Sequence, residues 1–330
     1  MSQFYEFGLK YPYLVYDIWD FYCDNKINGM NSDIIKRNGI NTEVFQPKCT
    51  LDFLNNFSKV YQELDSSAPI QPWTIAKICD SLCEYRYLQK FETTGFNNID
   101  KVTNFYYGNA NKKVDKEVLS NIFNSVVFGF QYIYEHNKSN VLPIYAKKGD
   151  NQFIGTCFKT IHGIITAKHC VEKCDNIRIG NFDKESLENS IILSKDNLDL
   201  IVIQLKSNYD WKKCLFIEKG IVLDEIMVMG YPSHSGFDNF VTATKGSIAA
   251  IEKSYLTKYD LMLLTSKVKG GNSGGPVINT KGNVVGIVTE TPISEGKNYD
   301  QFGYGLAMPQ EYIEEIINSG QKYDKDIIFK

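Results

Sequence analysis

The stretch Lys267-Val268-Lys269-Gly270-Gly271-Asn272-Ser273-Gly274-Gly275-Pro276-Val277 places four glycines around one serine. Glycine lets the backbone take positive φ angles and approach another group closely. A serine on such a turn presents its hydroxyl to open space, with N–H groups aimed at one spot. An acyl-transfer nucleophile with an oxyanion hole needs this arrangement. The alternative is a surface turn that merely contains a serine, and the rest of the chain must decide between them.

The segment from Gly271 to Pro276 resembles the nucleophile loop of trypsin-like (chymotrypsin-fold) serine proteases. Two other stretches resemble the histidine and aspartate motifs of that family: Ile164-Ile165-Thr166-Ala167-Lys168-His169-Cys170 and Asp196-Asn197-Leu198-Asp199-Leu200-Ile201-Val202. The order His169, Asp199, Ser273 is the trypsin-like order. The resemblance implies that His169 moves the proton of Ser273 and that Asp199 orients His169. It also implies an oxyanion hole formed by the backbone N–H groups of Gly271 and Ser273.

Four further segments resemble the HtrA-like bacterial branch of the family: 230–232, 241–248, 286–289 and 303–309. By this resemblance, the edge Thr289, Glu290, Thr291 pairs with the substrate backbone, and Gly305 and Ala307 line the specificity pocket. HtrA-like enzymes usually carry a C-terminal PDZ module. The chain ends at Lys330, so we expect a member without that module, controlled by its N-terminal part or by a partner.

Several alternatives stay open at this stage. Asp196 is the second candidate for the acid, although an aspartate there is also a common turn acceptor. His136, His162 and His234 compete with His169, and the last two fall in expected loops. Lys267 lies six residues before Ser273, a position that in trypsin relatives forms the base of the specificity pocket. A lysine there would favour an acidic residue on the acyl side of the scissile bond. The alternative is a solvated lysine.

Asn272 departs from the family pattern. In digestive relatives an aspartate at this position pairs with a freshly cleaved amino terminus, and no Ile-Val-Gly-Gly start precedes the first barrel here. We therefore expect activity that does not depend on release of such a terminus.

Composition narrows the classes of protein. The chain has 330 residues, 43% of them apolar, and a net charge of −3, which gives no general attraction to nucleic acid or anionic membranes. No signal-peptide pattern or long apolar run is found, so we expect a cytoplasmic protein. In that compartment most of the eight cysteines are free.

Two pairs of cysteines could have a role as metal ligands or as a disulfide. Cys79 and Cys83 share a predicted helix face, but no CxxC or histidine pair accompanies them, so packing is favoured over a metal site. Cys157 and Cys170 occupy positions where secreted trypsins carry a disulfide, and we expect a reduced, neighbouring pair. We expect no metal and no cofactor.

Hydrophobic periodicity predicts two domains, a mainly helical one over 1–140 and a strand-rich one over 141–330. The family resemblance implies that the strands of 141–330 form a double β-barrel of the trypsin-like type. The fold class is therefore multidomain α+β. Helices are predicted over 13–22, 52–64, 72–79 and 84–91, from an Asp115 cap to Glu135, and over 309–319. Strands are predicted over 153–158, 163–166, 176–179, 190–193 and 200–205 for one barrel, and over 225–230, 241–251, 261–265, 276–278 and 284–289 for the other.

Residues 68–110 resemble a winged-helix module in the order helix, turn, helix, hairpin, the hairpin being expected over 92–107. The second helix would carry Arg86 and Lys90, a small basic set for reading DNA. A protein-interaction or regulatory role is therefore favoured over nucleic-acid binding. The sequence as a whole predicts a serine endopeptidase acting on polypeptides. A retired protease-fold scaffold and a nucleic-acid-linked regulator are the alternatives.

Overall fold

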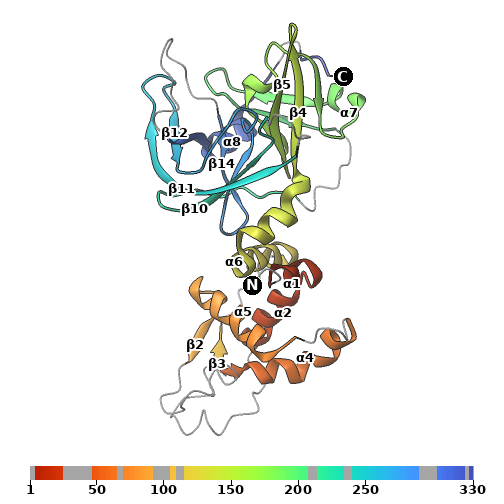
Figure 1. Ribbon diagram of the computed structural model, residues 1–330, viewed down its shortest axis with the longest axis vertical. Helices are drawn as coiled ribbons and strands as arrows, with labels where there is room; N and C mark the ends of the chain where they lie inside the picture. Colours follow the sequence, from red (N-terminus) through yellow and green to blue (C-terminus); the bar gives the residue numbers. More distant parts are fainter. Residues whose placement is uncertain are drawn as a thin grey trace. The chain divides into compact units, whose positions relative to one another are not determined.

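The computed structural model describes residues 4–24, 47–64, 70–91, 105–108, 115–206, 214–233, 240–289, 303–323 and 327–329. These residues form two compact units, Met1–Tyr132 and Ile133–Lys330. The division falls inside the helix α6 (Lys116–Asn137), whereas the sequence places the domain limit at residue 140. Figure 1 shows the elements of both units coloured along the chain.

The first unit consists of helices around a small sheet. The helices are α1 (Phe4–Lys10), α2 (Leu14–Cys23), α4 (Thr50–Leu64), α5 (Pro72–Glu84) and the first part of α6. The strands β1 (Lys48–Cys49), β2 (Gln89–Phe91) and β3 (Phe105–Tyr107) pair antiparallel in the order β1-β3-β2. Two of the predicted helix starts are confirmed: Pro72 opens α5, and the Asp115 carboxylate accepts the N–H groups of Glu117 and Val118 at 2.8 and 3.3 Å.

One prediction for this unit was wrong, and two others are confirmed only in part. The expected helix over 84–91 does not form, because α5 runs on to Glu84 and the chain then turns through Arg86 (φ 62°) into β2. The hairpin expected over 92–107 therefore begins earlier, with β2 as its first strand. The predicted long helix after Asp115 is also interrupted, since Gly129 has φ 71° and ψ −165°, outside the helical region.

The second unit begins with a seven-stranded antiparallel sheet in the order β16-β8-β9-β6-β5-β4-β7. After η1 (Lys138–Asn140), its strands are β4 (Val141–Lys148), β5 (Asn151–Thr160), β6 (Gly163–Thr166), β7 (Asp175–Ile179), β8 (Ile191–Ser194), β9 (Ile201–Gln204) and β16 (Gln321–Lys322). The short η2 (Lys168–Cys170) and α7 (Lys184–Glu188) lie in its connections. Alternate side chains of these strands fill one apolar core, which includes Ile144, Ile164, Ile177 and Ile203.

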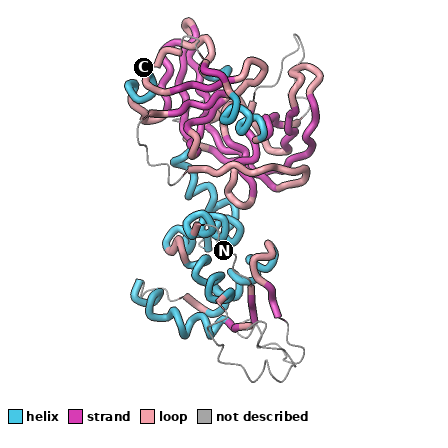
Figure 2. Tube along the Cα trace, turned by 180° about the vertical axis from the view of Figure 1, so that it is seen from behind, coloured by secondary structure: helices cyan, strands magenta, loops and turns pink. Residues whose placement is uncertain are grey.

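The second sheet closes into a six-stranded barrel in the order β10-β11-β12-β15-β14-β13. Its strands are β10 (Glu225–Gly230), β11 (Thr242–Lys253), β12 (Asp260–Leu264), β13 (Pro276–Asn279), β14 (Val284–Val288) and β15 (Gly305–Pro309), followed by α8 (Glu311–Ser319). Closure leaves no free edge because β10 pairs with both β11 and β13. Figure 2 shows the strands of the second unit in magenta from the opposite side.

The double-barrel prediction is confirmed at the level of two antiparallel sheets in one unit, with one difference. Among the described residues the first sheet stays open between β16 and β7 and is a half-barrel, whereas only the second closes. The sequence also missed β4 and β15. β4 lies directly after the expected domain limit at residue 140 and pairs along its whole length with β5. Its pattern is hidden because Pro143 and Lys147 interrupt the apolar run.

Candidate active site

His169 and Asp199 come from neighbouring strands of the first sheet. His169 lies in η2, just after β6 ends, and Asp199 lies just before β9 begins. Since β6 and β9 pair antiparallel, with Thr166 opposite Ile201, the end of one strand meets the start of the other. The Asp199 carboxylate accepts the backbone N–H of His169 at 2.9 Å, and its other oxygen lies 2.7 Å from His169 Nδ1.

A third donor comes from the second barrel. The Thr289 hydroxyl donates to Asp199 Oδ2 at 2.7 Å, and Thr289 is only 5% exposed at the end of β14. Its N–H donates to the Leu306 carbonyl at 3.1 Å. Thr289 was expected to pair with substrate through its backbone, and its described side-chain contact is with Asp199. The signal available in the sequence was a threonine that ends the buried run Gly286-Ile287-Val288.

The two side chains shift each other's proton affinity. Burial alone would raise the pKa of Asp199, but the hydrogen bonds from His169 and Thr289 outweigh it and hold that pKa below its ordinary value. Burial alone would lower the pKa of His169, but the Asp199 carboxylate and the neighbouring Cys170 outweigh it and raise that pKa. The pair therefore stabilises the imidazolium form of His169.

The backbone conformation of the serine loop requires glycine at two positions. Gly271 has φ 98° and Gly274 has φ 82°. A Cβ on Gly271 would lie 2.3 Å from the Tyr231 carbonyl oxygen, and one on Gly274 would lie 2.2 Å from the Thr156 carbonyl oxygen. The N–H of Asn272, between them, donates to the Lys269 carbonyl. Within the described chain the N–H groups of Gly271 and Ser273 donate to no protein acceptor, as an oxyanion hole requires.

Thr156 of β5, which is fully buried, connects the first sheet to this loop. Its hydroxyl donates to the Gly271 carbonyl at 2.7 Å and accepts the Tyr231 N–H at 2.9 Å, while its own N–H donates to the Ser273 carbonyl at 2.9 Å. The Cys170 thiol, one residue after His169, also lies 3.5 Å from the Ser273 carbonyl oxygen. These contacts bring the Ser273 main chain beside the histidine turn. Sequence reasoning missed Thr156, because nothing in its local pattern marks it.

The remaining predicted site residues are those assigned to substrate binding. Lys267 is exposed, and its carbonyl accepts the Thr244 hydroxyl. The residue that faces Gly305 is Val268, whose Cγ2 would be 2.4 Å from an added Cβ there. This arrangement favours a solvated Lys267. Ala307 is buried in the barrel core beside β12, and Glu290 and Thr291 lie outside the described residues.

Three of the four competing residues lie in the described part of the chain. Asp196 is exposed, His162 is exposed in the turn between β5 and β6, and His136 lies in α6, while His234 lies outside the described residues. Asn272 is 3% exposed, and its Oδ1 has no hydrogen-bond partner among the described residues.

The eight cysteines are free thiols. Cys157 and Cys170 pack in the same core of the first sheet, and burial raises the pKa of Cys157 strongly. Across the described part of the chain, no group of three or more His, Cys, Asp or Glu side chains is placed to hold a metal ion. Within the same residues no helix has the length and apolar character needed to cross a bilayer.

A histidine held by a half-buried aspartate, beside a glycine-bracketed serine and between two antiparallel sheets, is the architecture of a chymotrypsin-like hydrolase domain. Comparison with known families agrees. Residues 155–287 match the family model described as the trypsin-like peptidase domain.

Among curated proteins the chain is similar to HtrA-type serine proteases. It is 27% identical over 181 residues to the serine protease Do-like HtrA of Bacillus subtilis (strain 168), which covers 51% of this chain and 39% of that protein. It is 30% identical over 164 residues to a probable periplasmic serine endoprotease DegP-like of Buchnera aphidicola subsp. Schizaphis graminum, covering 48% of this chain and 33% of that protein. The chain thus spans well under half the length of these two relatives.

A solved structure described as the HtrA-type protease AlgW with tripeptide aligns with a TM-score of 0.44 at 21% identity. The alignment covers 57% of this chain and 62% of that one.

Proposed function

We propose that the protein is a serine endopeptidase that hydrolyses polypeptides with Ser273 as nucleophile, His169 as general base and acid, and Asp199 as the orienting carboxylate. The observation that carries the proposal is the 2.7 Å contact between His169 Nδ1 and Asp199 Oδ2, made beside the glycine-bracketed Ser273 turn. The similarity to HtrA-type serine proteases supports the same chemistry. No cofactor is required, because these side chains supply both the nucleophile and the proton carrier.

The reaction follows from the hydrogen bonds. Asp199 holds the Nδ1–H tautomer of His169, an assignment made from the bond itself, which leaves Nε2 as the acceptor. Nε2 takes the Ser273 proton as Oγ attacks the scissile carbonyl, and the carbonyl oxygen becomes an oxyanion. The N–H groups of Gly271 and Ser273 stabilise that oxyanion. The imidazolium then gives its proton to the leaving amine, and water repeats the sequence on the acyl-enzyme to release the acid.

We assign substrate binding to residues on either side of the nucleophile loop. The edge that begins at Thr289 and continues through Glu290 and Thr291 would pair with substrate backbone on the acyl side. Gly305, Ala307 and the adjacent Val268 would line the pocket for the side chain before the scissile bond. Because Asn272 carries no charge, we expect activity without release of a new amino terminus.

Regulation is assigned to the first unit, as a recognition or regulatory domain within residues 1–140. The order α2, β1, α4, α5, β2, β3 with sheet order β1-β3-β2 supports a winged-helix module that starts earlier than residue 68. On α5, Trp73 is 56% exposed, and nearby Lys90 pairs with Asp80 at 3.1 Å. Asp80 neutralises the charge of Lys90 on this surface, and the tryptophan beside it is exposed. Such a surface fits a protein partner better than nucleic acid.

The first experiment is labelling with a fluorophosphonate, which reacts only with an activated serine. We expect the wild type to be labelled, the Ser273→Ala and His169→Ala variants to be unlabelled, and Ser319→Ala, a serine at the end of α8, to be labelled as the wild type is. Absence of labelling in a folded wild type would favour the retired scaffold. Salt-dependent nucleic-acid binding by the full chain would favour the regulator.

Two further parts of the proposal have their own tests. Cleavage-site profiling on a whole proteome would identify the substrate class. The proposed cytoplasmic location, with Cys157 and Cys170 reduced, is tested by cell fractionation and thiol alkylation.

A further inference from the structure

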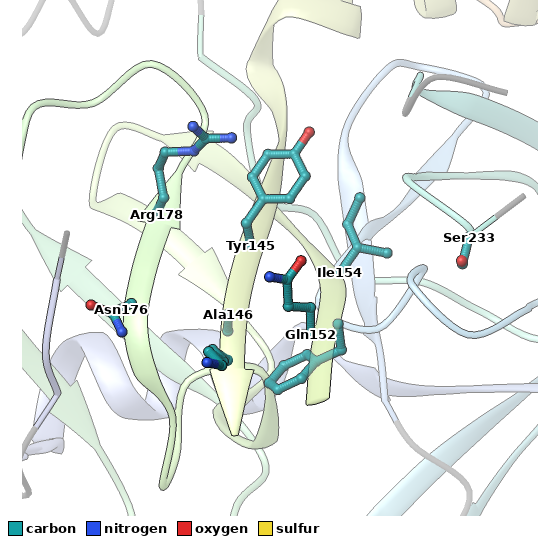
Figure 3. Close-up of a pocket in the computed structure, with 9 residues that line it drawn as sticks. Tyr145, Ala146, Gln152, Ile154, Asn176, Arg178 and Ser233 are labelled. Carbon is teal, nitrogen blue, oxygen red and sulfur yellow. The ribbon is translucent and has the colours of Figure 1, made fainter. Parts of the chain in front are cut away.

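A pocket of about 650 Å³ lies on the first sheet, outside the residues assigned to catalysis. Strands β4, β5 and β7 form its floor, and Ser233, which follows β10, forms one wall (Figure 3). The side chains that matter for its chemistry are Tyr145, Lys147, Gln152, Ile154, Asn176 and Arg178. The described lining holds two cations and no carboxylate.

The pocket starts at the nucleophile loop. The Ser233 N–H donates to the Gly270 carbonyl at 3.1 Å, and Ile154 Cγ2 would lie 3.1 Å from a Cβ added to Gly271. The acyl-side edge adjoins the loop at its other end, where the Gly274 N–H donates to the Val288 carbonyl at 2.8 Å. The pocket thus adjoins the loop before Ser273 and the edge adjoins it after Ser273, which is the arrangement expected if a substrate strand that follows the edge continues towards the pocket.

Register sets one row of side chains across the three strands. Ile154 on β5 is opposite Tyr145 on β4, and Tyr145 is opposite Arg178 on β7. Figure 3 shows these three side chains in a line, with Ile154 at the end nearest Ser233. At about 4.8 Å per strand, the Arg178 backbone lies roughly 10 Å from that of Ile154. This span equals about three residues of an extended peptide.

Arg178 is prepared to bind an anion. Its guanidinium stacks on the Tyr145 ring, 4.7 Å from the centroid, which restricts a long side chain without using its N–H donors. Arg178 is exposed to solvent, and no carboxylate in the described part of the chain forms an ion pair with it. The pairing of β4 with β7 is shifted by a bulge between Tyr145 and Lys147, where Asn176 takes φ 53°. Tyr145 remains opposite Arg178 on one side of this bulge. The other cation of the lining, Lys147, lies opposite Asp175 in the register.

We propose that this pocket binds the segment of substrate that follows the scissile bond, and that Arg178 selects a carboxylate at the second or third residue of that segment. The inference rests on the proposed function and names part of its substrate class. The carboxylate has two sources, an Asp or Glu side chain and a free C-terminus close to the cleavage point. Guanidinium recognises both through paired N–H donors.

The test uses a cleaved peptide carrying Glu or Gln at those two positions. We expect kcat/KM of the wild type to favour Glu by about fivefold, the upper range for an exposed pair. Arg178→Gln should reduce this preference to below about twofold, and Arg178→Lys should retain part of it. Lys184→Gln, which removes a cation of α7 that pairs with Glu188 and does not line the pocket, should leave it unchanged. A second set of peptides, ending at the third residue as free acid or amide, separates the C-terminal source from the side-chain source.

Fluorophosphonate labelling keeps the two proposals distinguishable, because that probe has no leaving segment to fill the pocket. Equal labelling of wild type and Arg178→Gln, with no charge preference on either peptide set, would overturn the pocket proposal and leave the protease intact. Should the wild type not be labelled, binding of fluorescent Ala-Glu-Glu-Ala and Ala-Gln-Gln-Ala decides. Tighter binding of the acidic peptide that is lost in Arg178→Gln supports the carboxylate site, and equal binding refutes it.

Discussion

Thr289→Val tests the hydrogen-bond chain behind His169, the proposed base. Valine keeps the shape of threonine at a site that is 5% exposed, and it removes the hydroxyl that donates to Asp199 Oδ2 at 2.7 Å. Asp199 would keep its two bonds from His169 and lose the third. Its carboxylate would then stabilise the His169 imidazolium less well.

The magnitude follows from the charge of the acceptor. A hydrogen bond to a charged group contributes about 1.5–3 kcal/mol, and the 21% exposure of the Asp199 side chain lets water replace part of it, so the lower end applies. At about 1.4 kcal/mol per tenfold change, we expect the rate of fluorophosphonate inactivation to fall roughly tenfold. Thr289→Ser keeps the hydroxyl and should stay close to the wild-type rate.

The pH dependence of stability gives a second readout. The pKa of Asp199 is lowered in the folded chain, so its contribution is present above the unfolded pKa and is lost as pH falls through the folded pKa. Without the Thr289 hydroxyl the folded pKa rises, and acid unfolding, followed by circular dichroism, should begin at higher pH. A Thr289→Val protein with the wild-type inactivation rate and acid midpoint would show that this hydroxyl does not support the pair.

Three further predictions concern other residues. Thr156→Val strands the Gly271 carbonyl and the Tyr231 N–H, so stability should fall by about 2–4 kcal/mol in urea titrations and labelling should slow, whereas Thr156→Ser should behave as the wild type. Gly274→Ala should abolish labelling, because its Cβ would meet the Thr156 carbonyl oxygen at 2.2 Å, while Gly149→Ala, with open space around it, should keep it. Burial lowers the pKa of Lys48 to about 8, so between pH 8 and 10 the unfolded chain binds one more proton at this lysine than the folded chain does. The free energy of unfolding of the wild type should therefore rise with pH relative to that of Lys48→Met. A difference that stays constant over this pH range would contradict the prediction.

Sequence alone determined the chemistry-bearing segments and most strands. The glycine run around Ser273, the histidine turn after an apolar strand and the aspartate before another each carry their signal within a few residues. Local φ requirements and period-two burial are properties of short segments, which is why they can be read without the fold. The same reasoning failed where local signals were weak or misleading: β4 contains a proline and lysines, and residues 84–91 have an apolar spacing that suits a helix but form a turn and a strand.

Tertiary structure alone decided what surrounds these segments. It brought the Thr289 hydroxyl to Asp199 across 90 residues of chain and the Thr156 hydroxyl to Gly271 across 115. It placed Val268, and not Lys267, against Gly305. It also aligned Ile154, Tyr145 and Arg178 in one row on three strands. Such contacts depend on strand register and on the packing of two sheets, which are set by the summed burial of the whole core and leave no trace at the single positions that meet.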